Sequence, residues 1–209
     1  MEKKDGLKKH SNKNPQISIF IDGSNIFRAG VNLYGKKIPP ENLVNILSKN
    51  KNIINTYYFS SEDRANARQV RFHENLNKKH QINVFTEPLA YKQKIINCRN
   101  CNHQILPGKC PKCFYDNILK PETSKRIDVL LAVTMLDKMN EFNEAILVTG
   151  DADFIPLIRK LKYEKGKKIL LASFKDSLAN DYVNPDSETG KKVVDDIILL
   201  DNYKKQLLK

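Results

Sequence analysis

Acidic side chains follow two apolar segments of the chain at the point where each segment ends. Asp22 comes after the run ISIFI, and Asp151 follows AILVTG, with Asp153 two residues further on. A third acid, Asp128, lies within the run KRIDVLLAV. Each has an ordinary structural explanation, because an aspartate can form an Asx turn, cap a helix or lie favourably near a helix N-terminus.

Gathered at one place, the same acids would favour a bound cation. Carboxylates that lie close together repel one another and raise one another's pKa unless a cation lies among them. Ligands that offer only oxygen atoms suit Mg²⁺ or Mn²⁺, which bind through few carboxylates and keep several waters. A site of this kind can activate water and stabilise both the attacking and the leaving oxygen of a phosphodiester displacement.

Alternating apolar and amphipathic segments predict the fold that brings these acids together. We expect strands at 17–21, 54–60, 82–88, 145–150 and 167–173, and helices at 41–50, 62–79, 124–139 and 153–165. Ala65, Phe72 and Leu76 are the expected inward stripe of the helix at 62–79. Strands that alternate with helices indicate a parallel sheet with helices on both faces, and ligands of such sheets bind at the carboxyl ends of the strands. Segments 177–183 and 191–200 have no clear assignment.

Four cysteines lie in one short segment and indicate a zinc site. Cys98 and Cys101 form one CxxC pair, and Cys110 and Cys113 form a second pair eight residues later. Two such pairs present four thiolates to a tetrahedral Zn²⁺, which stabilises a loop too small to have its own core. Unrelated buried cysteines and a redox pair are the alternatives, and the doubled motif without a following helix disfavours the redox pair. We therefore expect a zinc-ribbon-like insertion over residues 91–123 in which His103 is not a ligand.

The charge of the chain favours a polyanionic partner. The formal net charge is +12, although a lysine-rich composition throughout the chain gives the same sum. The insertion is basic, and its residues Arg99, Lys109 and Lys112 are candidates for a nucleic-acid clamp. A surface for protein docking or self-association is the alternative function of the insertion. Arg64 and Arg68 recur on one face of an expected helix and could bind successive phosphates. An ordinary solvated helix face has the same pattern and is the alternative.

Length and hydropathy bound the class of protein. The 209 residues suit one globular domain, expected at 16–209 after a basic, flexible tail at 1–15. The sequence contains no apolar run of the roughly 18 residues that a membrane span needs, and the N-terminus lacks the apolar core of a secretory signal. We expect a cytoplasmic location. Neither glycine-rich nucleotide-binding motif, GxxxxGK[ST] or GxGxxG, is present.

Three motifs resemble those of a known nuclease family. FIDGSN (20–25), KRIDVLLAV (125–133) and VTGDADF (148–154) resemble, in order and spacing, the motifs of the NYN domain in its LabA-like branch, within the PIN-like nuclease superfamily. The resemblance covers residues 16–175 apart from the insertion. It implies a PIN-like three-layer α/β sandwich with a mostly parallel sheet and metal-dependent cleavage of RNA. It also implies that Asp22, Asp128 and Asp151 bind Mg²⁺ or Mn²⁺, that Asp153 supports them, and that Asn25 positions the substrate or the attacking water.

One departure from the family pattern keeps a second function open. Many relatives carry a further aspartate at the position of Thr134, and Asp137 lies one helical turn beyond that position. A domain that binds RNA or single-stranded DNA without cutting it is therefore the alternative to a ribonuclease. A phosphatase is disfavoured, because Ser24 stands where a nucleophilic DxD motif would need its second aspartate.

Overall fold

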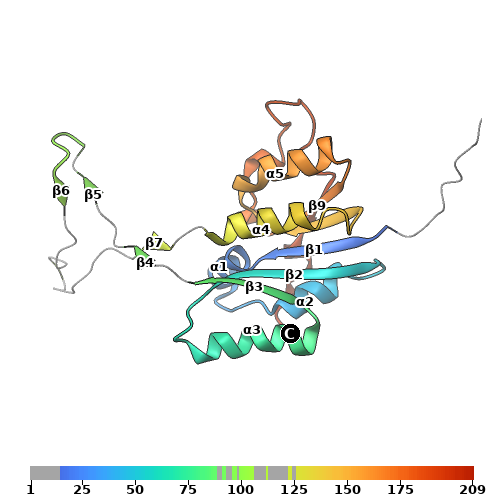
Figure 1. Cartoon of the computed structure of the whole chain (residues 1–209), viewed down its shortest axis with the longest axis horizontal. Coiled ribbons are helices and arrows are strands. Elements are labelled where there is room, and N and C mark those ends of the chain that lie inside the picture. Colours follow the sequence, from blue (N-terminus) through green and yellow to red (C-terminus); the bar gives the residue numbers. More distant parts are fainter. Residues whose placement is uncertain are drawn as a thin grey trace, which may run out of the picture.

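The computed structural model describes residues 15–88, 91–92, 96–97, 99–105, 112, 122–123 and 126–209. In this part of the chain six strands form one sheet, and all neighbouring strands of that sheet run parallel (Figure 1). The six strands are β1 (Ile17–Asp22), β2 (Ile53–Glu62), β3 (Asn83–Pro88), β8 (Glu144–Val148), β9 (Lys168–Ser173) and β10 (Asp196–Leu199). The α/β class is confirmed, and this sheet is parallel throughout rather than mostly parallel.

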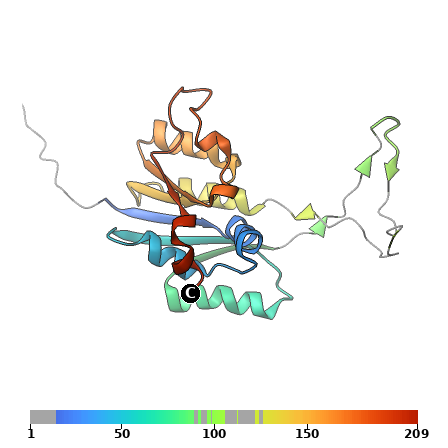
Figure 2. The ribbon, with the colours of Figure 1, turned by 180° about the vertical axis from the view of Figure 1, so that it is seen from behind.

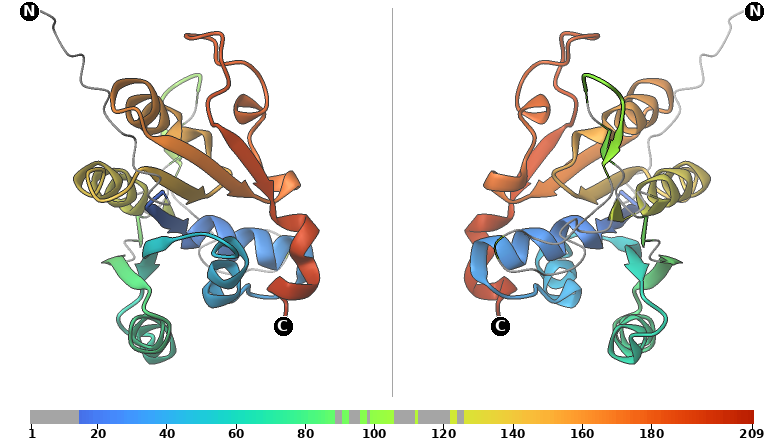
Figure 3. Two further views of the ribbon diagram at one scale, coloured as in Figure 1. Left: turned by 90° about the vertical axis from the view of Figure 1, so that its right-hand side faces the viewer. Right: turned by 90° about the vertical axis from the view of Figure 1, so that its left-hand side faces the viewer.

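Helices cover both faces of the sheet and make three layers (Figures 1 and 3). They are α1 (Gly23–Tyr34), α2 (Pro40–Leu47), α3 (Ala67–His80), α4 (Arg126–Asp137), α5 (Ile155–Arg159) and α6 (Lys204–Leu207). One core lies under α1, α2, α3 and α6, and the other lies under α4 and α5. Alternate residues of β1 enter the two cores, with Ile19 and Ile21 in the first and Phe20 in the second.

The two central strands are apolar because both of their faces are covered. All six residues of β1 and all five of β8 are buried, so neither strand shows the polar alternation of a half-exposed strand. On the first face the C-terminal segment closes the layer beside α2, where the Asn42 amide donates a hydrogen bond to the Leu207 carbonyl at 3.1 Å (Figure 2).

The strand order reverses at one point, between β1 and β8. The order across the sheet is β10-β9-β8-β1-β2-β3, so the chain builds outward from β1 through β2 to β3 and then returns to β8. In open parallel sheets this reversal leaves a crevice outside the carboxyl ends of the two strands, where ligands bind. The acids that follow β1 and β8 therefore lie at the point where the topology favours a site.

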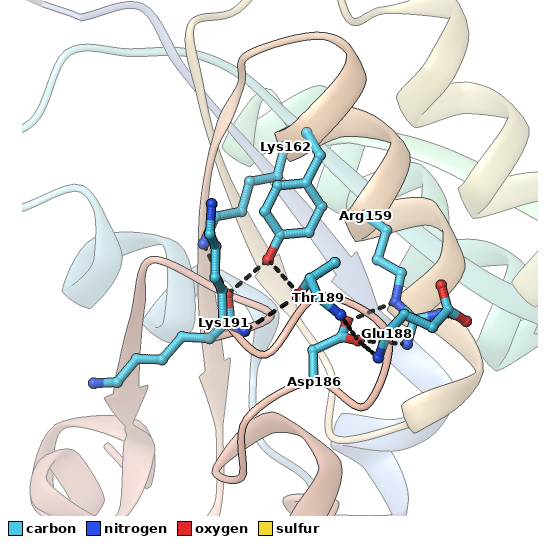
Figure 4. Close-up of polar contacts among 8 residues, drawn as sticks. Arg159, Lys162, Asp186, Glu188, Thr189 and Lys191 are labelled. Carbon is cyan, nitrogen blue, oxygen red and sulfur yellow. Dashed lines mark hydrogen bonds and ion pairs between the residues drawn. The ribbon is translucent and has the colours of Figure 1, made fainter.

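A long connection between β9 and β10 packs over α5. Nε and Nη2 of Arg159 donate to the two carboxylate oxygens of Asp186 at 2.6 and 2.9 Å, and Arg159 also pairs with Glu188 (Figure 4). Asp186 Oδ1 accepts further hydrogen bonds from the backbone N–H groups of Glu188 and Thr189. These contacts fix the connection on the α5 side of the sheet. The segments without a sequence assignment form part of this region: a 3₁₀ turn at Asn180–Tyr182 and, after the loop, β10.

The inward face of α3 differs from the prediction. The buried residues of α3 are His73 and Leu76, whereas Phe72 is 39% exposed and Ala65 precedes the helix. His73 is held inside because its Nδ1 lies 2.8 Å from Glu62 Oε1 at the end of β2. Leu76 as an inward residue is thus confirmed, and the placing of Phe72 and Ala65 on that face was wrong.

The segment between β3 and α4 leaves and rejoins the domain at the carboxyl edge of the sheet. Among its described residues, Tyr91–Lys92 (β4) pairs with Glu122–Thr123 (β7), and Ile96–Asn97 (β5) pairs with Gln104–Ile105 (β6), both antiparallel. Cys101 is exposed, while Cys98, Cys110 and Cys113 lie outside the described residues, as do Lys109 and the tail at 1–14. Searched over its described part, the chain has no helix with the length and apolarity required to cross a membrane.

Candidate active site at the carboxyl edge

Asp22 ends β1 and is buried, with 3% of its surface exposed. Its Oδ1 accepts a hydrogen bond from the Asn25 backbone N–H at 3.0 Å and so caps α1. Its Oδ2 accepts from the Thr149 hydroxyl at 3.1 Å, which ties the end of β1 to the residue that follows β8. The capping function that the sequence allowed is therefore present, and it fixes both oxygens of this carboxylate at the junction of the two central strands.

Burial leaves the negative charge of Asp22 poorly compensated. Its pKa is raised to about 6, chiefly because burial disfavours the charged form and also because Asp128 is negative. The hydrogen bonds from Asn25 and Thr149 and the charge of Arg28 lower the same pKa without cancelling the effect of burial. A cation beside Asp22 would supply the missing compensation.

The turn after β8 is joined to the end of β1 through Thr149. Thr149 Oγ1, which donates to Asp22, accepts a hydrogen bond from the backbone N–H of Asp151 at 3.2 Å. Asp151 Oδ1 in turn accepts from the Asp153 backbone N–H at 3.0 Å and caps the 3₁₀ turn Ala152–Phe154 (η1). Asp22 and Asp151 are thus linked through one hydroxyl group. Thr149 was missed by the sequence analysis, although a threonine directly before Gly-Asp at the end of a buried strand was the available signal.

The β9–β10 connection packs closely on the same turn. A Cβ at Gly150 would lie 1.8 Å from the Ser177 carbonyl oxygen, so only glycine fits without movement of the backbone. The Ala179 N–H donates to the Gly150 carbonyl at 3.1 Å, and the Tyr182 hydroxyl donates to the Asp151 carbonyl at 2.6 Å. Tyr182 is buried, and burial together with the charge of Asp151 raises its pKa, which keeps the hydroxyl protonated as a donor.

Asp128 belongs to α4, the helix that follows the insertion in the sequence. It lies in the first turn of α4, between the buried Ile127 and the exposed Val129, and is close enough to Asp22 to raise the pKa of that residue. Thr134 lies further along α4, is 6% exposed, and donates its hydroxyl to the Leu130 carbonyl at 2.8 Å. Asp137 is paired with Lys138 at the far end of α4. Neither residue adds an acid to the site.

Asn25 contributes an acceptor that has no hydrogen-bond partner in the described part of the chain. It lies in the first turn of α1, and its Oδ1 is buried without a hydrogen bond. A buried acceptor left in this state costs about 1–3 kcal/mol, so such atoms usually serve a ligand or a water. Its position beside Asp22 makes it a candidate ligand or substrate contact.

These residues suit a divalent cation that keeps several waters, rather than one enclosed fully by protein ligands. No group of three or more His, Cys, Asp or Glu side chains in the described part of the chain is arranged to hold a metal. Mg²⁺, however, usually binds through one or two carboxylates and keeps several waters. The undercompensated Asp22, the nearby Asp128 and the unpartnered Asn25 Oδ1 meet that lower requirement.

The basic candidates lie outside this cluster. Arg64 and Arg68 are exposed, Arg64 before α3 and Arg68 in its first turn at the carboxyl edge of the sheet. Arg99 and Lys112 are exposed residues of the insertion.

Comparison with known proteins gives a family match and matches among solved structures. The model of the family described as NYN domain matches residues 16–188. A crystal structure of a Vibrio parahaemolyticus protein of unknown function is 15% identical, covers 92% of this chain and 97% of its own, and superposes with a TM-score of 0.63. A structure of a Sir2 enzyme is 10% identical and covers 94% and 93% of the two chains, but its TM-score is only 0.38. No curated protein matches the chain.

Proposed function

Because the chain belongs to the NYN domain family, a family of PIN-like nucleases, we propose that it is a metal-dependent endoribonuclease of the LabA-like branch. The observation that carries the proposal is the buried Asp22, whose charge lacks compensation beside Asp128 and beside the unpartnered oxygen of Asn25. This combination lies at the topological switch point, where a substrate has access to the carboxyl ends of β1 and β8.

Each residue has a distinct role in this proposal. Asp22 and Asp128 would hold Mg²⁺ or Mn²⁺ with Asp151, while Asp153 supports Asp151 through the η1 turn. Asn25 Oδ1 would orient the attacking water or a phosphate, since it is a fixed and otherwise unused acceptor. A bound divalent cation supplies positive charge beside the phosphodiester and lowers the pKa of water. Thr149 ties the Asp22 carboxylate to the backbone of Asp151 through its two hydrogen bonds.

Cleavage of a generic single-stranded RNA in the presence of Mn²⁺ tests the proposal. The Asp22→Asn, Asp128→Asn and Asp151→Asn proteins should lose activity by a factor of about 100 or more, as expected when charge stabilisation in the transition state is removed. Asp137→Asn is the matched control, because Asp137 lies on the same helix as Asp128 but is exposed and paired with Lys138. Retained cleavage by both Asp22→Asn and Asp151→Asn would contradict the assignment.

A module that binds RNA or single-stranded DNA without cutting it is the second candidate. It is favoured by Thr134, a buried threonine in place of a family acid, and by the lack of a three-carboxylate cluster among the residues described here. In that case the purified protein retains RNA with a steep salt dependence and yields no product with Mg²⁺ or Mn²⁺.

The insertion belongs to the same proposal as a structural zinc site. Cys98, Cys101, Cys110 and Cys113 would bind one Zn²⁺, and Arg99, Lys109 and Lys112 would face nucleic acid. Elemental analysis should find one zinc per chain and none in a protein with all four cysteines replaced by serine.

A further inference from the structure

Two aromatic rings are exposed beside the candidate site. Phe27 on α1 is 47% exposed and Phe72 on α3 is 39% exposed. Phe72 contacts the ring of Tyr58 edge-on, with 6.3 Å between the ring centroids. The hydroxyl end of Tyr58 in turn lies against Gly23, where a Cβ would be 2.5 Å from the Tyr58 oxygen.

Phe27 belongs to the same surface. It follows Gly23 by one helical turn, so the two residues share a face of α1. Gly23 itself follows Asp22, the central carboxylate of the site. Both phenylalanines therefore adjoin the point where β1 ends, and each leaves a large part of its ring in solvent.

Cations accompany both rings. Lys37 Nζ lies 5.4 Å from the centroid of the Phe27 ring. Arg68 precedes Phe72 by one helical turn of α3, and both side chains are exposed. Residues 23–37 contain three basic residues and no acidic one, and residues 63–74, which surround Phe72, contain three basic and two acidic residues. The surface thus combines exposed aromatic rings with an excess of positive charge.

We propose that Phe27 and Phe72 are stacking platforms for unpaired bases of a single-stranded RNA, and that Lys37 and Arg68 bind its phosphates. The inference rests on the proposed function, because an RNA strand held by these rings would lead to the carboxylate at the end of β1. Aromatic rings next to cations are the combination by which proteins bind single strands with little sequence preference. Bases paired in an A-form duplex are stacked on one another and do not present their faces to such rings. A protein partner could use the rings, but the excess of cations specifically complements a polyanion.

Binding measured apart from cleavage tests the proposal. Fluorescence anisotropy of a labelled single-stranded oligouridine RNA with the full chain, in Ca²⁺ in place of Mg²⁺ or Mn²⁺, gives the dissociation constant. Phe27→Leu and Phe72→Leu should each weaken binding about fivefold or more, because leucine keeps apolar burial but has no ring to stack on. Phe27→Tyr and Phe72→Tyr should bind as wild type. Tyr163→Leu is the matched control, since Tyr163 is an exposed aromatic with Lys162 near its ring on the opposite layer.

Salt dependence separates stacking from charge. Arg68→Gln and Lys37→Gln should each reduce the slope of log affinity against log salt by about one, and the leucine variants should leave that slope unchanged. Wild-type affinity in both leucine variants would overturn the proposal, as would equal binding of an RNA duplex by the same surface. If those variants bind normally while Asp22→Asn abolishes cleavage, the stacking proposal is contradicted and the proposed nuclease site is supported. If they bind RNA more weakly while Asp22→Asn still cleaves, the proposed nuclease site is contradicted and the stacking proposal is supported.

Discussion

Asp22 is nearly excluded from solvent and receives only two hydrogen bonds, so its ionised form opposes folding. Its pKa in the folded chain, about 6, exceeds the ordinary value of 3.8. The folded state therefore binds more protons between these two values, and stability rises as the pH falls through that range. At neutral pH without added divalent ions, the difference corresponds to a penalty of up to about 3 kcal/mol.

Replacing this carboxylate should stabilise the protein while it removes function. We expect Asp22→Asn to raise the melting temperature at neutral pH, to flatten the gain in stability between pH of about 6 and about 4, and to lose cleavage. Added Mg²⁺ should stabilise the wild type more than the variant, because a cation bound to the folded state stabilises it by mass action. Thermal melts at several pH values, with and without Mg²⁺, measure all three effects. An Asp22→Asn protein that melts below the wild type would contradict this account of Asp22.

Gly150 is constrained by packing rather than by its backbone angles. Because a Cβ would collide with the Ser177 carbonyl, Gly150→Ala must separate the turn at residues 150–153 from the β9–β10 connection. We expect a loss of about 1–3 kcal/mol and a loss of cleavage, measured by urea unfolding and RNA assay. Gly166→Ala is the control, since Gly166 has a φ of +63° but open space around it and should lose only about 1 kcal/mol without loss of cleavage. Equal effects of the two substitutions would argue against close packing as the reason for Gly150.

At the scale of elements, the β9–β10 connection holds the turn that carries Asp151 through a hydrogen bond from Tyr182. The Tyr182→Phe protein loses the donor to the partly buried Asp151 carbonyl, which should cost about 1–3 kcal/mol and lower kcat with little change in KM. Tyr163→Phe is the matched control, because Tyr163 donates to the Lys192 carbonyl at the surface and should change stability by less than about 0.5 kcal/mol. A change in KM alone would place Tyr182 in substrate binding instead.

The elements themselves were largely predictable, and the exceptions have physical causes. The apolar runs of β1 and β8 followed directly from hydropathy, and their residues are buried. Periodicity failed at α3, because His73 is polar by type yet enters the interior through its contact with Glu62. The β9–β10 connection carries no periodicity at all, since its position depends on side-chain contacts such as that between Arg159 and Asp186.

At the scale of the whole molecule, the site needs segments that are distant in sequence. The acids at the ends of β1 and β8 could be found as residues, but their proximity depends on the strand order, and no local pattern encodes which strands become neighbours. Thr149 and Tyr182 escaped notice for the same reason, because their functions are contacts to Asp22 and Asp151 across the fold. The motif resemblance supplied this long-range information before the structure did.

The contact between Arg159 and Asp186 ties the β9–β10 connection to α5, and its loss should lower the stability of the whole domain. Arg159 holds the pKa of Asp186 below its ordinary value through two hydrogen bonds, so this contribution to stability is complete above the ordinary pKa and is lost as the pH falls through the lowered one. We expect Asp186→Asn to lower the melting temperature at neutral pH and to lose less further stability than the wild type as the pH falls below about 4. The double variant Arg159→Gln with Asp186→Asn should be less destabilised than the sum of the two single changes, because the residues interact directly. Lys160→Gln is the control, since the Lys160–Glu164 pair is exposed on both sides and such pairs contribute little. Additive effects in the double variant, or an acid profile of Asp186→Asn parallel to that of the wild type, would show that this contact does not hold the connection in place.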